Sequence, residues 1–199
     1  MQKTSSLMVR MDEESKALLT AAAELRQVSV SDFVRSVIEN LAKLHDRKKF
    51  KSGNFEVDQW LSQTALQSQS KRLTNTKVLL NEVSAIVGYY TLATSQVDFS
   101  DLPQGLAKSL PQRPLPVAVL AWLGIAKSYQ GQGIGKRLLA TALRDCHRAG
   151  QTFAFIAVVL DCLDHTAKQF YQRFDFEELP GYPMRLYLPF QRLDKMMNS

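Results

Sequence analysis

The chain contains little cysteine and no long apolar run. Its 199 residues include only two cysteines, Cys146 and Cys162. Two are too few for a disulfide framework or a structural zinc site, so we expect packed thiols and no metal. No stretch approaches the roughly 20 consecutive apolar residues of a membrane span, and residues 1–15 lack the apolar core of a signal peptide. These absences predict a cytoplasmic protein that does not contact a membrane.

Positive charge is present but unevenly distributed. The formal net charge is +6, and residues 1–45 contain six basic and six acidic residues, so the whole excess lies in residues 46–199. Clustered cations attract a polyanion such as a nucleic acid, because binding releases the counterions of its phosphates. A solvated basic face that only aids solubility explains the charge equally well. Composition leaves both interpretations open.

A glycine-rich segment between two apolar patterns is the most informative stretch. Residues 117–125 form an apolar run typical of a buried strand, and apolar residues after position 137 recur at helical spacing. The segment 130–135, which reads QGQGIG, therefore lies at a strand-to-helix junction. A helix start offers unpaired N–H groups and the positive end of the helix dipole, and glycines let the chain approach a phosphate closely. The pattern predicts a diphosphate-binding turn, with an ordinary glycine turn as the alternative.

The order of residues in this turn resembles the Q/R-x-x-G-x-G/A motif of the GNAT acyltransferases, with Gln130, Gly133 and Gly135 in the motif positions. A dinucleotide-binding motif is less similar, because its third glycine and its later acidic residue are not matched. The resemblance implies acetyl-CoA as the cofactor, with the pantetheine lying along the preceding strand like an added strand. It assigns cofactor binding to Leu123, Gly124, Ile125, Gln130, Gly131, Gln132, Gly133, Ile134, Gly135 and Lys136.

Further motifs extend this resemblance along the chain. Residues 50–61, FKSGNFEVDQWL, resemble the F-x-[CS]-G-x-x-x-[LV]-D-x-[WF]-L opening of GNAT toxins that acetylate aminoacyl-tRNA. Residues 87–92 and 167–176 resemble later motifs in the same order, although Asp175 replaces the glycine of Phe-Gly-Phe and loses its conformational freedom. The likeness covers nearly all of residues 50–188. It implies the α-amine of aminoacyl-tRNA as the acceptor.

The same resemblance implies a general acid. Tyr171 matches the family tyrosine regarded as the proton donor to the departing thiolate, and its reference pKa near 10 lies only modestly above the value near 8.5 of a thiol. A core aromatic is the alternative role for Tyr171. An α-amino group titrates near 7.7–8.0, whereas a lysine near 10.4 is almost wholly charged, so an enzyme without an evident base suits an α-amine. Asp161 and Glu82 are conceivable bases or amine orienters, and each is equally well a solvated loop carboxylate.

A tRNA-binding surface is also implied by the family, and we assign it to Lys71, Arg72 and Lys77. Related chains often carry a basic G-x-S-R-T stretch here, and Asn75 stands where its arginine is expected. An asparagine cannot hold a phosphate by charge. We therefore expect Lys71 and Arg72 to compensate from displaced positions.

Residues 1–45 form a separate predicted module. Residues 5–11 alternate like a strand, a helix follows, and Ser31 begins a second helix whose apolar repeat runs to Leu41. Such a module is too short to bury a core, and its single strand has no partner, so dimerisation would repair both defects. Residues 29–34, SVSDFV, resemble the start of helix two in ribbon-helix-helix antitoxins encoded beside GNAT toxins.

The ribbon-helix-helix resemblance implies a homodimer that binds operator DNA. Strands of two protomers pair in the major groove and present Ser6, Met8 and Arg10 outward. Arg10 can contact guanine through two hydrogen bonds, and the helix start near Ser31 can hold a backbone phosphate. Met8 stands where a polar base reader is usual, which puts sequence specificity in doubt. A module used only for dimerisation is the alternative.

The sequence therefore predicts an α/β GNAT acyltransferase fold over residues 46–199, preceded by a ribbon-helix-helix module over residues 1–45. Our main hypothesis is acetylation of aminoacyl-tRNA, which blocks translation, combined with repression of the protein's own gene. About a dozen residues join the two parts, too few to wrap the enzyme as a separate antitoxin tail does, so silencing would require occlusion within a dimer, a changed substrate or a separate inhibitor. An acetyltransferase of protein or small-molecule amines and an acetyl-CoA-sensing transcriptional regulator are the alternatives.

Overall fold

The computed structural model describes residues 37–198. The chain divides into two units, Met1–Val37 and Ile38–Ser199. The predicted ribbon-helix-helix strand and the start of its second helix lie outside the described residues, as do the four expected DNA contacts, Ser6, Met8, Arg10 and Ser31. That module and the boundary at residue 45 stay predictions.

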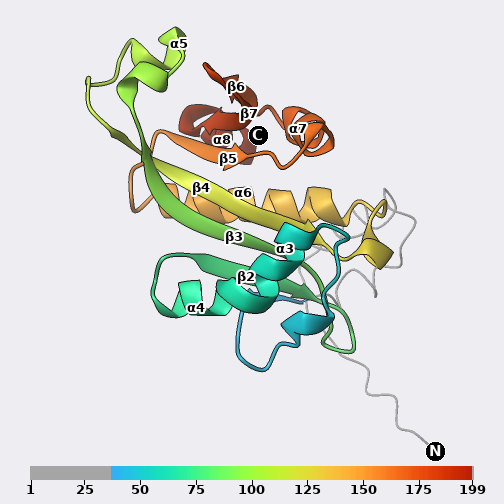
Figure 1. The fold of residues 1–199 in the computed structure, drawn as a ribbon. Coiled ribbons are helices and arrows are strands. Elements are labelled where there is room, and N and C mark those ends of the chain that lie inside the picture. Colours follow the sequence, from blue (N-terminus) through green and yellow to red (C-terminus); the bar gives the residue numbers. More distant parts are fainter. Residues whose placement is uncertain (1–36, 199) are drawn as a thin grey trace, which may run out of the picture. The chain divides into compact units, whose positions relative to one another are not determined.

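A seven-stranded sheet forms the centre of the described unit, in the order β1-β2-β3-β4-β5-β7-β6 (Figure 1). β4 and β5 are parallel, and the pairs β2–β3, β3–β4, β5–β7 and β6–β7 are antiparallel. The strands are β1 (Val37–Asn40), β2 (Asn75–Leu80), β3 (Ile86–Val97), β4 (Leu115–Ile125), β5 (Ala157–Asp161), β6 (Glu177–Leu179) and β7 (Tyr182–Pro189). This mixed α/β sheet agrees with the predicted fold class for the second part of the chain.

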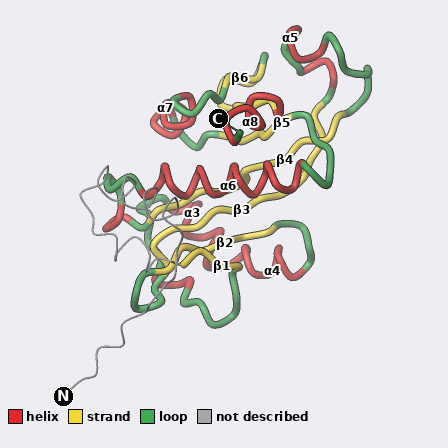
Figure 2. The backbone as a smooth tube through the Cα atoms, turned by 180° about the vertical axis from the view of Figure 1, so that it is seen from behind, coloured by secondary structure: helices red, strands yellow, loops and turns green. Residues whose placement is uncertain are grey.

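Helices cover the sheet on both faces. The helical elements are η1 (Arg47–Lys49), α3 (Phe55–Gln59), the π-helix η2 (Trp60–Thr64), α4 (Ala65–Ser70), η3 (Phe99–Asp101), α5 (Gln104–Ala107), η4 (Lys127–Tyr129), α6 (Ile134–Gly150), α7 (His165–Gln172) and α8 (Phe190–Met197). α6 runs along β3 and β4 on one face (Figure 2), and with α7 and α8 it encloses the largest apolar cluster. α3, η2 and α4 enclose a second cluster on the other face.

The predicted helix through Leu41 is wrong at its carboxyl end. Val37–Asn40 form strand β1 at the edge of the sheet. The Leu41 backbone N–H donates to the Thr76 carbonyl at 2.9 Å, and the Leu41 side chain is buried in the cluster beside α3 and α4. The β-branched residues at 37 and 38 favour a strand, and pairing with β2 satisfies backbone groups that the helix would otherwise have paired.

Other local expectations are confirmed. The apolar run at 117–125 is β4, and the helical repeat after the glycine turn is α6, whose buried stripe includes Leu138 and Leu139. Strand β5 begins four residues later than position 153, where the sequence placed it. Cys146 and Cys162 are free, buried thiols. None of the helices described between residues 37 and 198 is long and apolar enough to cross a membrane.

Gly124, near the end of β4, is required by packing. A Cβ at this position would lie 2.6 Å from Val57 Cγ1 and 2.7 Å from Tyr89 Cε1, both well inside contact distance. The Tyr89 hydroxyl donates to the Val57 carbonyl at 2.7 Å, which locks the ring in place. β4 therefore lies unusually close to β3 and α3 at this point.

Gly124→Ala is expected to lower the free energy of unfolding by about 1–3 kcal/mol, because the added methyl group overpacks a locked site. Denaturant unfolding followed by circular dichroism measures the change. Gly105→Ala is the matched control, since no atom lies within 4 Å of its added Cβ. The control should leave stability unchanged or raise it by about 0.5 kcal/mol. Equal stability of the two variants would contradict the packing role of Gly124.

Candidate active site

The parallel strands β4 and β5 separate at the centre of the sheet. They pair through Ala118–Val158 and Val119–Val159, and β4 then continues to Ile125 with β3 as its described partner. β5 instead follows β7 to its end at Asp161. The edge of β4 beyond Val119 therefore offers backbone groups to an extended ligand, as the sequence predicted for the pantetheine of the cofactor.

A bulge accompanies this separation. Thr91 pairs with Trp122 and Leu92 pairs with Leu120, so Ala121 is an extra residue in β4. A bulge bends its strand and increases the local twist. This bend turns the end of β4 away from β5 and helps to open the wedge between them.

The glycine turn after β4 uses left-handed backbone conformations. Gly131 has φ +75° and Gly133 has φ +74°, and no atom lies within 4 Å of a Cβ placed on either residue. These two glycines are thus needed for their dihedral angles rather than for space. Gly135 lies within the first turn of α6, where an added Cβ would make ordinary contacts with Phe170 and Ile125.

Gln130 holds this turn against the rest of the site. Its side-chain amide donates to the Ile125 carbonyl at 3.0 Å and to the Ser52 carbonyl at 2.8 Å. Ile125 ends β4 only five residues earlier, whereas Ser52 lies in the loop before α3, so Gln130 ties the turn both to the end of β4 and to a segment 78 residues away in sequence. The sequence placed Gln130 among the cofactor-binding residues, and in the structure its amide nitrogen is engaged by the protein itself.

The start of α6 fits a diphosphate. α6 has 17 residues and begins at Ile134, and its N-cap residue Gly133 supplies no side-chain cap; its first turn contains no acidic residue. Its first N–H groups therefore lack intrahelical partners, and the dipole adds partial positive charge there. Lys136 is exposed in the same turn. The predicted residues Ile134, Gly135 and Lys136 are thus brought together at one anion-binding helix end.

Tyr171 lies on α7, which is capped by the Asp164 side chain accepting from the Ala167 N–H at 2.7 Å. The ring is 8% exposed and packs edge-on against Phe170 and Phe176. Its hydroxyl makes no hydrogen bond to any residue between 37 and 198. Burial first, and Cys162 second, raise the pKa of Tyr171 well above its usual value.

Tyr171 lies near the predicted cofactor turn. Its ring centroid is 5.2 Å from that of Phe170, and a Cβ on Gly135 would lie 3.7 Å from Phe170 Cζ and 3.8 Å from Ile125 Cγ1. α7 therefore packs where β4 ends and α6 begins, the region that the sequence predicted for the cofactor. At neutral pH Tyr171 is protonated and can donate a proton. Its raised pKa makes the transfer to a thiolate harder than reference values imply, unless the thiolate is desolvated to a similar degree.

The two carboxylates considered as bases lie in different environments. Asp161 ends β5 and forms a two-point ion pair with Arg185, at 2.7 Å and 2.9 Å. Arg185 also lies over the Tyr182 ring, 5.6 Å from its centroid, and Asp161 raises the pKa of Arg185. Glu82 is exposed in the turn between β2 and β3. Asp161 is therefore engaged in holding β7 rather than free to accept a proton.

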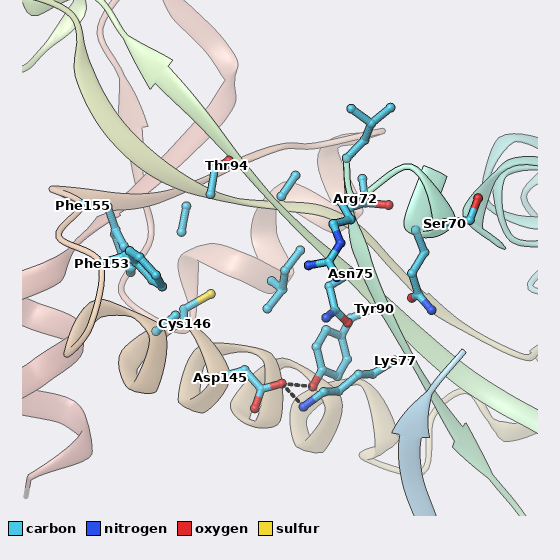
Figure 3. Close-up of a pocket in the computed structure, with 17 residues that line it drawn as sticks. Ser70, Arg72, Asn75, Lys77, Tyr90, Thr94, Asp145, Cys146, Phe153 and Phe155 are labelled. Atoms are coloured by element: carbon cyan, nitrogen blue, oxygen red, sulfur yellow. Dashed lines mark hydrogen bonds and ion pairs between the residues drawn. The ribbon is translucent and has the colours of Figure 1, made fainter. Parts of the chain in front are cut away.

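Two of the three expected tRNA contacts line one cavity (Figure 3). Arg72 and Lys77 belong to its lining, and Lys71 is exposed next to it in sequence. Lys77 is paired with Asp145 at 2.6 Å, and Asp145 also accepts from the Tyr90 hydroxyl at 2.5 Å. The positive charge of Lys77 is therefore partly neutralised by Asp145. Binding of RNA by Lys77 stays a prediction.

Sequence reasoning missed an aromatic pair on the face of the sheet covered by α3. Trp60 begins the π-helix η2, and its ring stacks on Trp122 of β4 with centroids 5.3 Å apart. The Trp60 ring N–H donates to Thr91 Oγ1, which bonds in turn to the buried Thr76 hydroxyl. π-helices are frequent at functional sites. The quoted 50–61 motif contained Trp60, but nothing local indicated its partner 62 residues later.

Comparison with known proteins gives consistent relatives. Residues 75–178 match the acetyltransferase (GNAT) domain family, a span of 104 of the 199 residues. A protein of Mycobacterium tuberculosis described as a tRNA-acetylating toxin is 30% identical over 153 residues, which cover 77% of this chain and 91% of that protein.

Solved structures share the fold over a similar span. A crystal structure of a tyrosine-to-phenylalanine mutant of KacT has a TM-score of 0.76 and 26% identity, covering 81% of this chain and 99% of that chain. A structure of a KacTA complex with DNA has a TM-score of 0.68 and 25% identity, covering 82% of this chain and 98% of that chain.

Gln130→Leu is expected to weaken acetyl-CoA binding about 5- to 10-fold, because two hydrogen bonds that hold the turn, each of about 0.5–1.5 kcal/mol, are lost. Isothermal titration calorimetry measures the change. Gln151→Leu is the matched control, since the Gln151 side chain bonds to His147 at the other end of α6, away from the turn. The control should change affinity less than about threefold. Equal effects of the two variants would contradict the role assigned to Gln130.

Proposed function

Because the chain belongs to the GNAT acetyltransferase family, we propose that it transfers the acetyl group of acetyl-CoA to the α-amine of an aminoacyl-tRNA and thereby blocks translation. The protein is an acetyl-CoA-dependent N-acetyltransferase. The likeness to a tRNA-acetylating toxin over 77% of the chain is the observation that most supports the choice of acceptor. The open edge of β4 beside Tyr171 supports it with a geometry suited to acyl transfer.

In the proposed reaction, one set of residues binds the cofactor and Tyr171 transfers a proton. N–H groups at the start of α6, with Lys136, hold the diphosphate, and the free edge of β4 orients the pantetheine. The bound cofactor supplies a thioester carbonyl, which the amine attacks so that a C–N bond forms and the C–S bond breaks. Tyr171 donates its proton to the sulfur that departs. The attacking nitrogen loses a proton to water or to the phenolate left by Tyr171, which restores the tyrosine.

The described site favours an amine that is already partly neutral. Asp161 is bound to Arg185 through both carboxylate oxygens, so it is poorly placed to deprotonate an ammonium group. An α-amine titrates near 7.7–8.0 and needs little help at neutral pH, whereas a lysine needs a base. The α-amine of an aminoacyl ester is therefore a better acceptor for this site than the lysine of a protein.

The basic charge of residues 46–199 supports an RNA-bound acceptor. Those residues carry the whole net charge of +6, and Lys71, Arg144 and Arg148 are exposed. Such cations attract the acceptor by its phosphates, whatever amino acid it carries. Affinity for charged tRNA should therefore fall steeply with salt, while affinity for a small amine should not.

The amino-terminal part is proposed to dimerise and to bind operator DNA through Ser6, Met8, Arg10 and Ser31. Its support is the sequence resemblance together with the likeness of the enzyme to a KacTA complex that contains DNA. A separate inhibitor is the third proposed partner. Gel-shift titration of the full chain against its own upstream DNA tests the operator proposal, and binding that is unchanged in Arg10→Ala would contradict it.

Tyr171→Phe is expected to lower the turnover number about 10²- to 10⁴-fold, the usual contribution of a positioned general acid. The affinity for acetyl-CoA and the melting temperature should change little, because the ring remains and the hydroxyl has no partner among residues 37–198. Single-turnover acetylation of charged tRNA, paired with calorimetric binding, separates the two effects. A variant that retains most of its turnover would show that Tyr171 is a core aromatic.

The pH profile distinguishes the acceptor classes. At saturating acetyl-CoA, kcat/KM should rise with pH and level off above about pH 8, because the neutral α-amine is the reactive form. For a lysine acceptor the rise would continue beyond pH 9. Steady-state assays between pH 6 and 9 measure the profile. Continued proportional rise through pH 9 would overturn the α-amine proposal.

A further inference from the structure

The cavity of Figure 3 lies away from the cofactor turn. It has a volume of about 830 Å³, within the range of small-molecule sites, and its lining shares no residue with the predicted cofactor set. Its helical wall is the carboxyl half of α6, from Asp145 to Ala149. Asp145 is eleven residues after Ile134, which at 1.5 Å per residue places this wall about 16 Å from the diphosphate-binding end of the helix.

Apolar side chains form one side of this cavity. Phe153 and Phe155 lie opposite Arg72 and Asn75, with Cys146 beside them (Figure 3). Within the described residues the Phe153 side chain is 76% exposed, an unusually high exposure for a phenylalanine. Burial raises the pKa of Cys146 to about 12, with a further contribution from Asp145, so this thiol is a packing group and not a nucleophile.

Positive charge faces this apolar side. Lys77 and Asp145 neutralise each other, since their charged atoms lie 2.6 Å apart. Arg72 has no such counterpart: its guanidinium forms no ion pair with any residue between 37 and 198, and Figure 3 shows it directed inward beside Asn75. Arg144 and Arg148 are exposed on α6 and add to the positive potential. The cavity therefore favours an anion.

Arg72 has a strained, left-handed backbone conformation. The Leu73 N–H donates to the Ser68 carbonyl and the Arg72 N–H to the Gln69 carbonyl, the two hydrogen bonds of a Schellman motif that ends α4. Glycine is usual at the left-handed position of this motif, yet Arg72 occupies it with φ +56°. An arginine where glycine would be less strained is consistent with a use for its side chain.

An unpaired hydroxyl points to the same ligand. Thr74 lines the cavity, and its Oγ1 is buried without a hydrogen-bond partner among residues 37–198. Buried hydroxyls in folded proteins almost always have a partner, and rotation about χ1 of Thr74 would turn this one toward a ligand in the cavity. Thr74, Asn75 and Arg72 thus offer a hydroxyl, an amide and a guanidinium within four consecutive residues.

We propose that this cavity is a second ligand site, separate from the acetyl-CoA site, which binds a small organic anion with an aromatic or aliphatic body. The anionic head contacts Arg72 and the Thr74 hydroxyl, and the body covers Phe153 and Phe155. The same chemistry is present in an aryl or alkyl carboxylate and in a nucleoside monophosphate. Binding here does not depend on the identity of the acetyl acceptor.

The test is a fluorescence titration of the full chain with 8-anilinonaphthalene-1-sulfonate, an aromatic anion, in saturating CoA so that the cofactor site is filled. Saturable binding at one site per chain is expected. Arg72→Gly should weaken it about 10-fold, the loss of a charge-assisted hydrogen bond. Its melting temperature should stay at or above the wild-type value, because glycine relieves the left-handed strain. Arg72→Lys should retain part of the affinity.

Further variants separate the site from general surface binding. Thr74→Val should weaken binding about threefold or more without loss of thermal stability, because the hydroxyl is unpaired in the protein. Lys108→Gln removes an exposed cation that does not line the cavity, and it should leave affinity unchanged. Absence of saturable binding, or equal affinities in the wild type, Arg72→Gly and Thr74→Val, would overturn the proposal.

Competitors identify the class of anion. Displacement by 1-naphthoate or decanoate but not by AMP would support a carboxylate ligand, and displacement by AMP would support a nucleoside phosphate. Displacement by uncharged 1-naphthalenemethanol as efficiently as by 1-naphthoate would overturn the anionic site and leave only an apolar patch.

Discussion

β4 and β5 run parallel, pair at two positions and then part, and the site depends on that parting. Each strand is held by its other neighbour: β4 pairs with β3 through ten residue pairs, and β5 with β7 through five. The wedge is therefore maintained by the ladders on either side and needs no ligand to hold it open. Backbone groups in the interior require hydrogen-bond partners, so the exposed edge of β4 suits a ligand with amides of its own, such as pantetheine.

Local contacts keep the ends of β4 and β5 apart. Gly124 allows β4 to approach α3 and Tyr89 more closely than any other residue would permit, and the extra residue Ala121 bends the strand. On β5, Asp161 is tied to Arg185 of β7. Tyr171 lies near the end of β4, whereas the ion pair with Arg185 makes Asp161 a poor proton acceptor. In the proposed mechanism Tyr171 donates a proton to the leaving group, and an amine that is already neutral needs no base.

The parts predictable from sequence are those with local causes. β4, the glycine turn and α6 are marked in the sequence by a continuous apolar run, three closely spaced glycines and a helical apolar stripe, and all three elements are found in the structure. The prediction that a helix continues to Leu41 is wrong because residues 37–40 form β1, which pairs with β2. The residues of β2 lie about 35 positions further along the chain, so no local pattern indicates this pairing. The Trp60–Trp122 stack, the Asp161–Arg185 pair and the cavity around Arg72 join residues distant in sequence, and no local pattern indicates them. Gln130 shows a different limit: the motif predicted it as a cofactor-binding residue, which stays a prediction, and its hydrogen bond to the Ser52 carbonyl is seen only in the folded structure.

The most direct test of the proposed acceptor is transfer of radiolabelled acetyl-CoA to a pool of charged tRNA, with uncharged tRNA and tRNA whose aminoacyl amine is chemically blocked as controls. The proposed function predicts label on charged tRNA alone, released as an N-acetyl amino acid when the ester is hydrolysed. Label on protein lysines or polyamines, with none on charged tRNA under conditions where acetyl-CoA is bound, would contradict it and would leave the enzyme an acetyltransferase with a different acceptor.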